Sequence, residues 1–165
     1  MDKNRGFTLI EFIVVISIAL LFLGISLPRY NDYSGQLKLR NEAKKLIDVL
    51  ELAKKKALSS DLIITPGPPR TYCANFTGYR ITVSSSSYSL SFGCASVYSV
   101  VQDYDLLTNI TATIGTGNYD FSPLMINPSF ISNTIRLKNS AISKCVTISV
   151  SPLGIFELNE ALISC

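Results

Sequence analysis

The spacing of apolar residues changes twice along the chain, and each stretch predicts a different element. The first stretch, residues 7–27, is an almost continuous apolar run, interrupted only by Thr8, Glu11, Ser17, Gly24 and Ser26. As an α-helix that rises about 1.5 Å per residue, this run spans about 30 Å, the thickness of the hydrocarbon core of a bilayer. The pattern therefore predicts a helix that can cross a membrane.

A second helical pattern follows Pro28. Proline removes one helix hydrogen bond and usually bends a helix, so we expect a kink at this residue. Farther along, apolar residues recur at alternating spacings of four and three, which is typical of one apolar stripe on a helix; they are Leu39, Ala43, Leu46, Leu50, Ala53 and Ala57. We predict one long helix from Phe7 to about Ser59, whose second half packs on a sheet.

The rest of the chain has the two-residue spacing of β-strands. The prolines and glycine of residues 65–69 predict a loop after the helix. Short alternating or β-branched runs follow, and they predict about five to seven mainly antiparallel strands; the runs are 79–83, 88–92, 109–114, 134–137 and 145–150. The serines of 84–87 are predicted to form a hairpin loop. The predicted fold class is α+β, a long N-terminal helix packed on a mainly antiparallel β-sheet head.

The charge distribution and the absence of histidine reduce the number of function classes that fit this chain. The formal net charge is +3, and the basic excess lies in the helical segment 37–58, whereas the head from residue 61 onward is slightly acidic. We expect a solvated basic face there, the alternative being contacts with anionic headgroups or neighbouring subunits. The chain has no histidine, and it lacks P-loop, G-x-S-x-G and H-E-x-x-H motifs. We predict that it is not an enzyme and binds no cofactor or metal.

Four cysteines, all in the predicted head, indicate an oxidising compartment. Their even number, without any C-x-x-C spacing or histidine, favours disulfides over a metal site; they are Cys73, Cys94, Cys145 and Cys165. Four cysteines allow three pairings, and sequence order favours Cys73 with Cys94 and Cys145 with Cys165. Reduced cysteines in the core are the alternative.

The residues that flank the apolar run indicate its orientation. Lys3 and Arg5 precede the run, so the positive-inside rule keeps the first residues cytoplasmic and sends the head outward. No small-residue cleavage site follows the run, so the apolar segment is expected to be retained. Glu11 is unusual, because an acid at the centre of a bilayer costs about 2.5–3.5 kcal/mol and therefore requires compensation.

Residues 5–11, Arg-Gly-Phe-Thr-Leu-Ile-Glu, resemble the type III signal of type IV prepilins and type II secretion pseudopilins. The resemblance implies that prepilin peptidase cleaves after Gly6 and leaves a free, usually methylated amine on Phe7. Glu11 lies one helical turn from Phe7, so its carboxylate can pair with the N-terminal cation of a neighbouring subunit. Phe7 and Glu11 would thus carry filament assembly. An uncleaved signal-anchor with a snorkelling glutamate and an ordinary signal peptide are the alternatives.

This resemblance implies four segments and a location for the chain. The segments are a leader peptide at 1–6, a transmembrane and filament-core helix at 7–28, its amphipathic continuation at 29–60, and a β-rich head at 61–165. The protein would make a single pass through the inner membrane with an extracytoplasmic head and then enter a pilus or pseudopilus. Its expected partners are prepilin peptidase, other pilin or pseudopilin subunits, the inner-membrane assembly platform and the lipid bilayer.

The second half of the chain resembles H-type pseudopilins and minor pilins, through the alanine-basic pattern of 53–57 and the strand pattern of 145–150. This resemblance implies a structural subunit, minor rather than major. A DNA-binding minor pilin is disfavoured, because no arginine pair follows Gly154 and the head is slightly acidic. A pilus-tip adhesin would use tyrosines of the head, although core packing explains most of them; they are Tyr72, Tyr79, Tyr88, Tyr98, Tyr104 and Tyr119.

Overall fold

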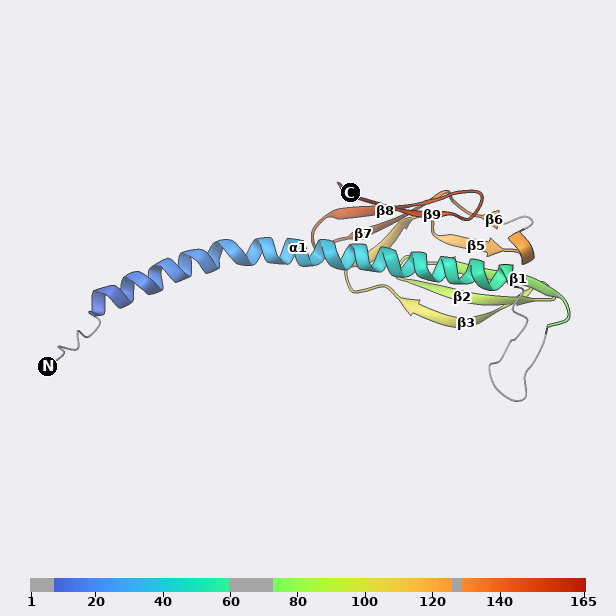
Figure 1. The fold of residues 1–165 in the computed structure, drawn as a ribbon, viewed down its shortest axis with the longest axis horizontal. Helices are drawn as coiled ribbons and strands as arrows, with labels where there is room; N and C mark the ends of the chain where they lie inside the picture. The colour runs from blue at the N-terminus through green and yellow to red at the C-terminus, as the bar shows by residue number, and fades with distance from the viewer. Residues whose placement is uncertain (1–7, 60–72, 126–128) are drawn as a thin grey trace, which may run out of the picture. The chain divides into compact units, whose positions relative to one another are not determined.

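The computed structural model describes residues 8–59, 73–125 and 129–165 (Figure 1). The side chains of 23–28 and 125 are outside this description. The chain separates into two compact units, Met1–Gly35 and Gln36–Cys165. One helix, α1 (Leu9–Leu58), contributes to both units. The predicted single long helix is therefore confirmed, whereas the predicted loop at 65–69 lies outside the described residues.

Within the first unit, α1 continues through Pro28 without a break in its helical assignment. A proline in a helix cannot donate to the carbonyl four residues earlier, so one backbone hydrogen bond is missing at this point. The predicted kink at Pro28 stays a prediction.

The second unit contains two antiparallel sheets and a short 3₁₀ turn, η1 (Pro123–Met125). The first sheet has the order β3-β2-β1-β5-β6, and the second has the order β4-β7-β8-β9. The strands are β1 (Phe76–Val83), β2 (Ser87–Cys94), β3 (Val97–Asp105), β4 (Ile110–Ile114), β5 (Gly117–Phe121), β6 (Ser129–Phe130), β7 (Thr134–Asn139), β8 (Lys144–Val150) and β9 (Phe156–Ser164). The predicted α+β fold with an antiparallel head is confirmed, and the head has two sheets.

The hairpin between β1 and β2 joins the two sheets. The backbone N–H of Ser84 donates to the carbonyl of Ser87 at 2.8 Å, which closes the predicted serine hairpin. The carbonyl of Ser85 then accepts a hydrogen bond from the N–H of Ala112 in β4, at 2.9 Å. This bond covers part of the free edge of β4, an edge that would otherwise present unpaired backbone groups.

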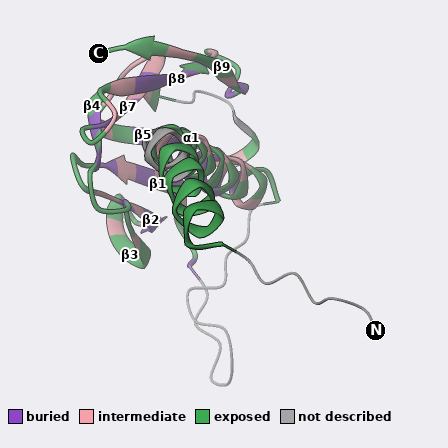
Figure 2. Cartoon of the chain, turned by 90° about the vertical axis from the view of Figure 1, so that its left-hand side faces the viewer, coloured by how far each residue is buried: buried purple, intermediate pink, exposed green. Residues whose placement is uncertain are grey.

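The core of the second unit lies between the helix and both sheets. All six residues of the predicted helical stripe are fully buried, and they meet the inward-facing residues of alternate strand positions. In β1 those positions are Tyr79, Ile81 and Val83, and in β8 they include Val146 and Ile148. Figure 2 shows buried residues on α1 and on the strands around it. The apolar stripe of the helix and the inward-facing residues of the strands thus form one hydrophobic core.

Basic side chains on the flanks of α1 bind the head. Arg40 Nη2 donates to the carbonyl of Glu160 in β9 at 3.1 Å, and Lys54 Nζ donates to the carbonyl of Gly154 at 2.7 Å. On the other flank, Lys56 Nζ lies 5.6 Å from the ring centroid of Tyr79. The basic side chains of the helix are therefore not all solvated, because Arg40, Lys54 and Lys56 contact the head.

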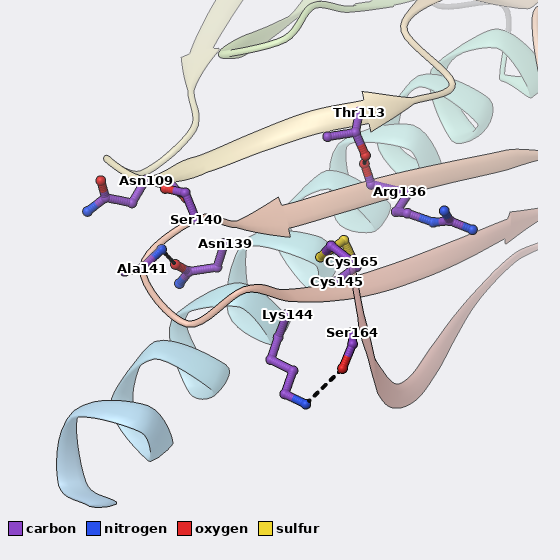
Figure 3. Close-up of a disulfide and its surroundings, with 10 residues drawn as sticks. All are labelled: Asn109, Thr113, Arg136, Asn139, Ser140, Ala141, Lys144, Cys145, Ser164 and Cys165. Atoms are coloured by element: carbon purple, nitrogen blue, oxygen red, sulfur yellow. Dashed lines mark hydrogen bonds between the residues drawn. A yellow bond between two sulfur atoms is a disulfide. The ribbon is translucent and has the colours of Figure 1, made fainter. Parts of the chain in front are cut away.

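Two disulfides cross-link the head, and they have the pairing that sequence order favours. Cys73 is bonded to Cys94 with a Cα separation of 5.8 Å, and Cys145 is bonded to Cys165 at 5.5 Å (Figure 3). The bridges close loops of similar length, with sequence separations of 21 and 20 residues. Each is expected to stabilise the head by about 3 kcal/mol through the restricted unfolded state.

Candidate functional site: the N-terminal end of the long helix

A reciprocal pair of hydrogen bonds forms the start of α1. The N–H of Glu11 donates to Oγ1 of Thr8 at 3.3 Å, while Oε2 of Glu11 accepts from the N–H and the hydroxyl of Thr8, each at 2.8 Å. This is a capping box, in which a threonine at the N-cap and a glutamate three residues later satisfy N–H groups that have no helical partner. Glu11 thus has a partner within its own chain.

The carboxylate of Glu11 has one oxygen directed to its own chain and one that is open. Oε2 accepts both hydrogen bonds from Thr8, whereas Oε1 receives no hydrogen bond from the described residues. Glu11 is exposed and lines a shallow groove of about 390 Å³ together with Ile10, Val14 and Val15. The first turn of a helix also favours an anion, because the unpaired N–H groups carry partial positive charge. An external cation can therefore approach Oε1 without disrupting the capping box.

The exterior of α1 around and beyond Glu11, from Leu9 to Phe22, is apolar on all sides. Eleven large apolar side chains between Leu9 and Phe22 are exposed, with exposed fractions from 41% to 78%; they are Leu9, Ile10, Phe12, Ile13, Val14, Val15, Ile16, Ile18, Leu20, Leu21 and Phe22. A helix that is apolar all round is normally buried in a larger assembly or a membrane. Full burial of each such side chain contributes about 1.5–3 kcal/mol.

The polar groups of this segment are satisfied locally. The hydroxyl of Ser17 donates to the carbonyl of Ile13 at 2.8 Å. Together with the Thr8–Glu11 capping box, this bond reduces the number of polar groups that would lose water without compensation if the helix became buried. The segment is therefore suited to an apolar environment in spite of its polar residues.

Among the described residues, none of the helices includes a segment whose length and apolar character suffice for a membrane crossing.

The tyrosines of the head are used in packing. Tyr79, Tyr88 and Tyr119 are buried, and burial raises the pKa of Tyr88 to about 12. Tyr104 is half-buried and stacks on Tyr88 with 5.0 Å between ring centroids. Tyr98 is also half-buried and holds the guanidinium of Arg80 over its ring, 3.7 Å from the centroid. Tyr72 lies outside the described residues. Packing contacts therefore occupy the described tyrosines of the head, which an adhesive surface would otherwise present.

The structure places only part of the predicted site. Glu11 is described, and its carboxylate is at the helix start, whereas Gly6 and Phe7 lie outside the described residues. Sequence reasoning missed Thr8, which donates both hydrogen bonds that the Glu11 side chain accepts from the described residues. The T-x-x-E spacing of residues 8–11 before an apolar run was the available signal, because that spacing is the mark of a capping box. Among the parts of the head that are described, we find no cluster of three or more potential metal ligands.

Comparisons with known proteins bear on the same segment. The family model described as the prokaryotic N-terminal methylation motif matches residues 1–27. Prepilin peptidase-dependent protein D of Escherichia coli strain K12 is 54% identical over 33 residues, which are 20% of this chain and 23% of that protein. The family model thus matches the N-terminal part alone, and the Escherichia coli relative matches one short segment of the chain.

Two further relatives match most of the chain. Both are fimbrial proteins of Pseudomonas aeruginosa, each 24% identical over 145 residues, which are 88% of this chain and 86% of the relative. No solved structure gives a significant match. The likeness to the fimbrial proteins therefore extends from the N-terminal segment into the head.

Proposed function

Because the chain carries the N-terminal methylation motif of the type IV pilin and pseudopilin family, we propose that it is a structural subunit of a pilus or a type II secretion pseudopilus. The observation that carries this proposal is the exterior of α1 from Leu9 to Phe22, which is apolar all round and begins with a capped carboxylate. Such a helix gains stability by burial against neighbouring helices. The likeness to fimbrial proteins along most of the chain supports the same function.

Processing is the first step of this proposal. Prepilin peptidase would cleave after Gly6, and the amine of Phe7 would become the methylated N-terminus. Support comes from the matched motif and from the likeness to prepilin peptidase-dependent protein D of Escherichia coli. Intact-mass measurement and N-terminal sequencing of protein from its native membrane should show N-methylated Phe7. A chain that keeps Met1, or that is cleaved near Tyr30, contradicts the proposal.

Assembly would then use the open oxygen of Glu11. The N-terminal cation of a neighbouring subunit donates to Oε1, while Oε2 remains bonded to Thr8. The attraction offsets the cost of removing the carboxylate from water, and its short range fixes the axial position of the incoming subunit. The capping box thus keeps Glu11 oriented before the neighbour arrives.

The test of this step is the incorporation of variants into sheared or purified filaments. Glu11→Ala removes a charge-assisted hydrogen bond, which corresponds to a loss of about tenfold to a hundredfold in the assembly equilibrium. Asp48→Ala is the matched control, because Asp48 is an exposed carboxylate of the same helix outside the apolar segment. Incorporation of Glu11→Ala at the wild-type level would sink this part of the proposal.

Before assembly, the subunit would reside in the inner membrane with its head outside the cytoplasm and would bind the assembly platform there. The apolar sequence of residues 7–27, the basic residues before it and the disulfides of the head support this location. Protease added to the outside of spheroplasts should digest the head. A head that is protected until the membrane is dissolved would contradict this location.

The subunit would be a minor rather than a major component. The support is the resemblance of residues 53–57 and 145–150 to H-type pseudopilins and minor pilins. Quantitative mass spectrometry of purified filaments should find this chain at a small fraction of the most abundant pilin. If it is itself the most abundant pilin, it is a major subunit.

A further inference from the structure

Two tyrosines of α1 are not used in packing. Tyr30 and Tyr33 belong to the unit Met1–Gly35, and their exposed fractions are 69% and 65%. Neither forms a hydrogen bond or a ring contact with any residue that the structure describes. By contrast, Tyr98 and Tyr104 of the head, which are only half-buried, each contact another side chain. The two helical tyrosines are therefore available to a partner outside the chain.

The rings of Tyr30 and Tyr33 lie on one side of the helix. Residues three apart in an α-helix are neighbours on its surface, so these two residues present one aromatic strip. Each ring has an apolar body and a hydroxyl at its tip, which suits a boundary between an apolar and an aqueous medium. Arg29 and Asp32 are exposed in the same turn. This turn thus combines aromatic and charged groups, unlike the apolar exterior of Leu9–Phe22.

The length of helix between Glu11 and the aromatic strip matches the thickness of a bilayer. α1 is helical throughout this stretch. Tyr30 follows Glu11 by about 19 residues, which is about 28 Å at the rise of an α-helix, and Tyr33 lies about 33 Å from Glu11. The hydrocarbon core of a bilayer is about 30 Å thick. When Glu11 lies at one boundary of this core, the two tyrosines therefore lie at the other boundary.

The charges near the strip agree with a position on the outward side of a membrane. Arg29 and Asp32 have opposite charges, so this turn adds no net positive charge outside the cytoplasm. The positive-inside rule places the other end of the apolar run inward, because Lys3 and Arg5 precede it. A guanidinium is also well suited to bind the phosphate of a lipid headgroup. The outward boundary is therefore the one that the strip fits.

We infer that Tyr30 and Tyr33 lie among the phospholipid headgroups of the outer leaflet and fix the depth of the unassembled subunit in the bilayer. Tyrosine is enriched at this boundary, because its ring leaves water while its hydroxyl keeps hydrogen-bond partners. The Arg29 guanidinium binds headgroup phosphates beside the rings. A fixed depth at this end also sets the depth of Glu11 at the other end. This inference rests on the proposed membrane location and identifies headgroups as the partner of this turn.

Single tryptophans provide the test, because the chain has no tryptophan of its own. Full-length Tyr30→Trp, Tyr33→Trp and Leu20→Trp are each reconstituted in phospholipid vesicles whose acyl chains carry bromine, a quencher of tryptophan fluorescence. The bromine is placed near the headgroups in one lipid (shallow) and near the methyl ends in the other (deep). Tyr30→Trp and Tyr33→Trp should be quenched more strongly by shallow bromine. Leu20→Trp should show the reverse order, because Leu20 is about 15 Å from Tyr30 along the helix.

A control on the same helix reports quenching outside the bilayer. Leu52 is 38% exposed and lies about 33 Å beyond Tyr30 along α1. Leu52→Trp should be quenched by neither lipid. This control shows that quenching of the other three variants comes from their position in the bilayer.

A second set of variants tests the tyrosines themselves, since tryptophan also prefers the interface. Tyr30→Leu with Tyr33→Leu removes both hydroxyls and extends the apolar run. In the Leu20→Trp chain, this pair should weaken quenching by deep bromine and strengthen quenching by shallow bromine, because Leu20 no longer stays at the bilayer centre. Tyr98→Leu, in the head, is the matched control and should leave the quenching unchanged. The urea midpoint of the head should stay at the wild-type value in Tyr30→Leu with Tyr33→Leu, because both residues lie outside its core.

The results separate this inference from the proposed location. Quenching of Tyr30→Trp and Tyr33→Trp mainly by deep bromine, or by neither lipid as a neighbouring helix on the strip would produce, overturns the inference. Unchanged quenching of Leu20→Trp after Tyr30→Leu with Tyr33→Leu also overturns it. The membrane location survives these results if deep bromine quenches Leu20→Trp. If neither lipid quenches Leu20→Trp, the location fails and the inference fails with it.

Discussion

The capping box at the start of α1 makes a sharp prediction for Thr8→Ala. This substitution removes the acceptor of the Glu11 N–H, at 3.3 Å, and the hydroxyl that donates to Glu11 Oε2, at 2.8 Å, while the bond from the Thr8 N–H to Oε2 can remain. Replacement of an N-cap threonine by alanine typically costs about 1 kcal/mol. Since 1.4 kcal/mol is a factor of ten, this cost corresponds to about fivefold more opening of the first turn.

Amide hydrogen exchange of the full chain in detergent micelles measures this opening directly. The Glu11 amide should exchange about fivefold faster in Thr8→Ala, whereas Thr8→Ser keeps a hydroxyl at the same position and should exchange at the wild-type rate. Thr8→Val has nearly the shape of threonine without its hydroxyl, so it should behave like Thr8→Ala. If the Glu11 amide exchanges equally slowly in all four proteins, the capping box does not hold the helix start, and Thr8 has no part in orienting Glu11.

Three other predictions concern the head. Leu46→Ala should destabilise it by about 2–5 kcal/mol in urea titrations, because Leu46 is fully buried, whereas Leu52→Ala at a 38% exposed position should change the midpoint little. Gly78→Ala should destabilise the β1–β5 pairing and lower the midpoint temperature of thermal unfolding. Gly78 has φ +131°, and an added Cβ would collide with the Phe121 carbonyl. A midpoint equal to that of the wild type would contradict this geometry. Raising the pH from about 10 to about 12 should lower the stability of the head. Burial raises the pKa of Tyr88 to about 12, so the unfolded chain releases the Tyr88 proton at a lower pH than the folded chain does. The loss of stability should be smaller in Tyr88→Phe, and equal losses in the two proteins would rule out Tyr88 as the cause.

The helix and its core face could be predicted from sequence because their signal is periodic and uninterrupted. The stripe from Leu39 to Ala57 is fully buried as predicted, since a fixed helical period assigns each apolar residue to one face. The central strands were also visible, because residues such as Ile135 and Leu137 alternate with polar neighbours. The disulfide pairing agreed with chain order because both bridges join segments that are close in sequence.

The strands that the sequence did not predict lack such a periodic pattern of apolar residues. β3 is an edge strand with seven exposed positions in its nine residues, so burial imposes no alternation on it. β5, Gly117–Phe121, contains Gly, Asn and Asp, which have low intrinsic preference for strands, and it is fixed by pairing with β1 and by the burial of Tyr119. Tertiary contacts, rather than local preference, determine both strands. The division of the head into two sheets depends on the same long-range pairing.

The two units of the chain have different kinds of apolar surface, and this difference separates stability from assembly. In the unit Gln36–Cys165, the large apolar residues of the helical stripe are fully buried within one chain, and two disulfides cross-link the same unit. From Leu9 to Phe22, by contrast, the apolar side chains are exposed and the structure supplies them with no cover. Substitutions in the head core should therefore reduce the amount of folded subunit, and the remaining folded molecules should still assemble. Substitutions at Thr8 or Glu11 should leave the head folded at its normal urea midpoint and reduce its entry into filaments, because their contacts lie entirely outside the core that stabilises the head.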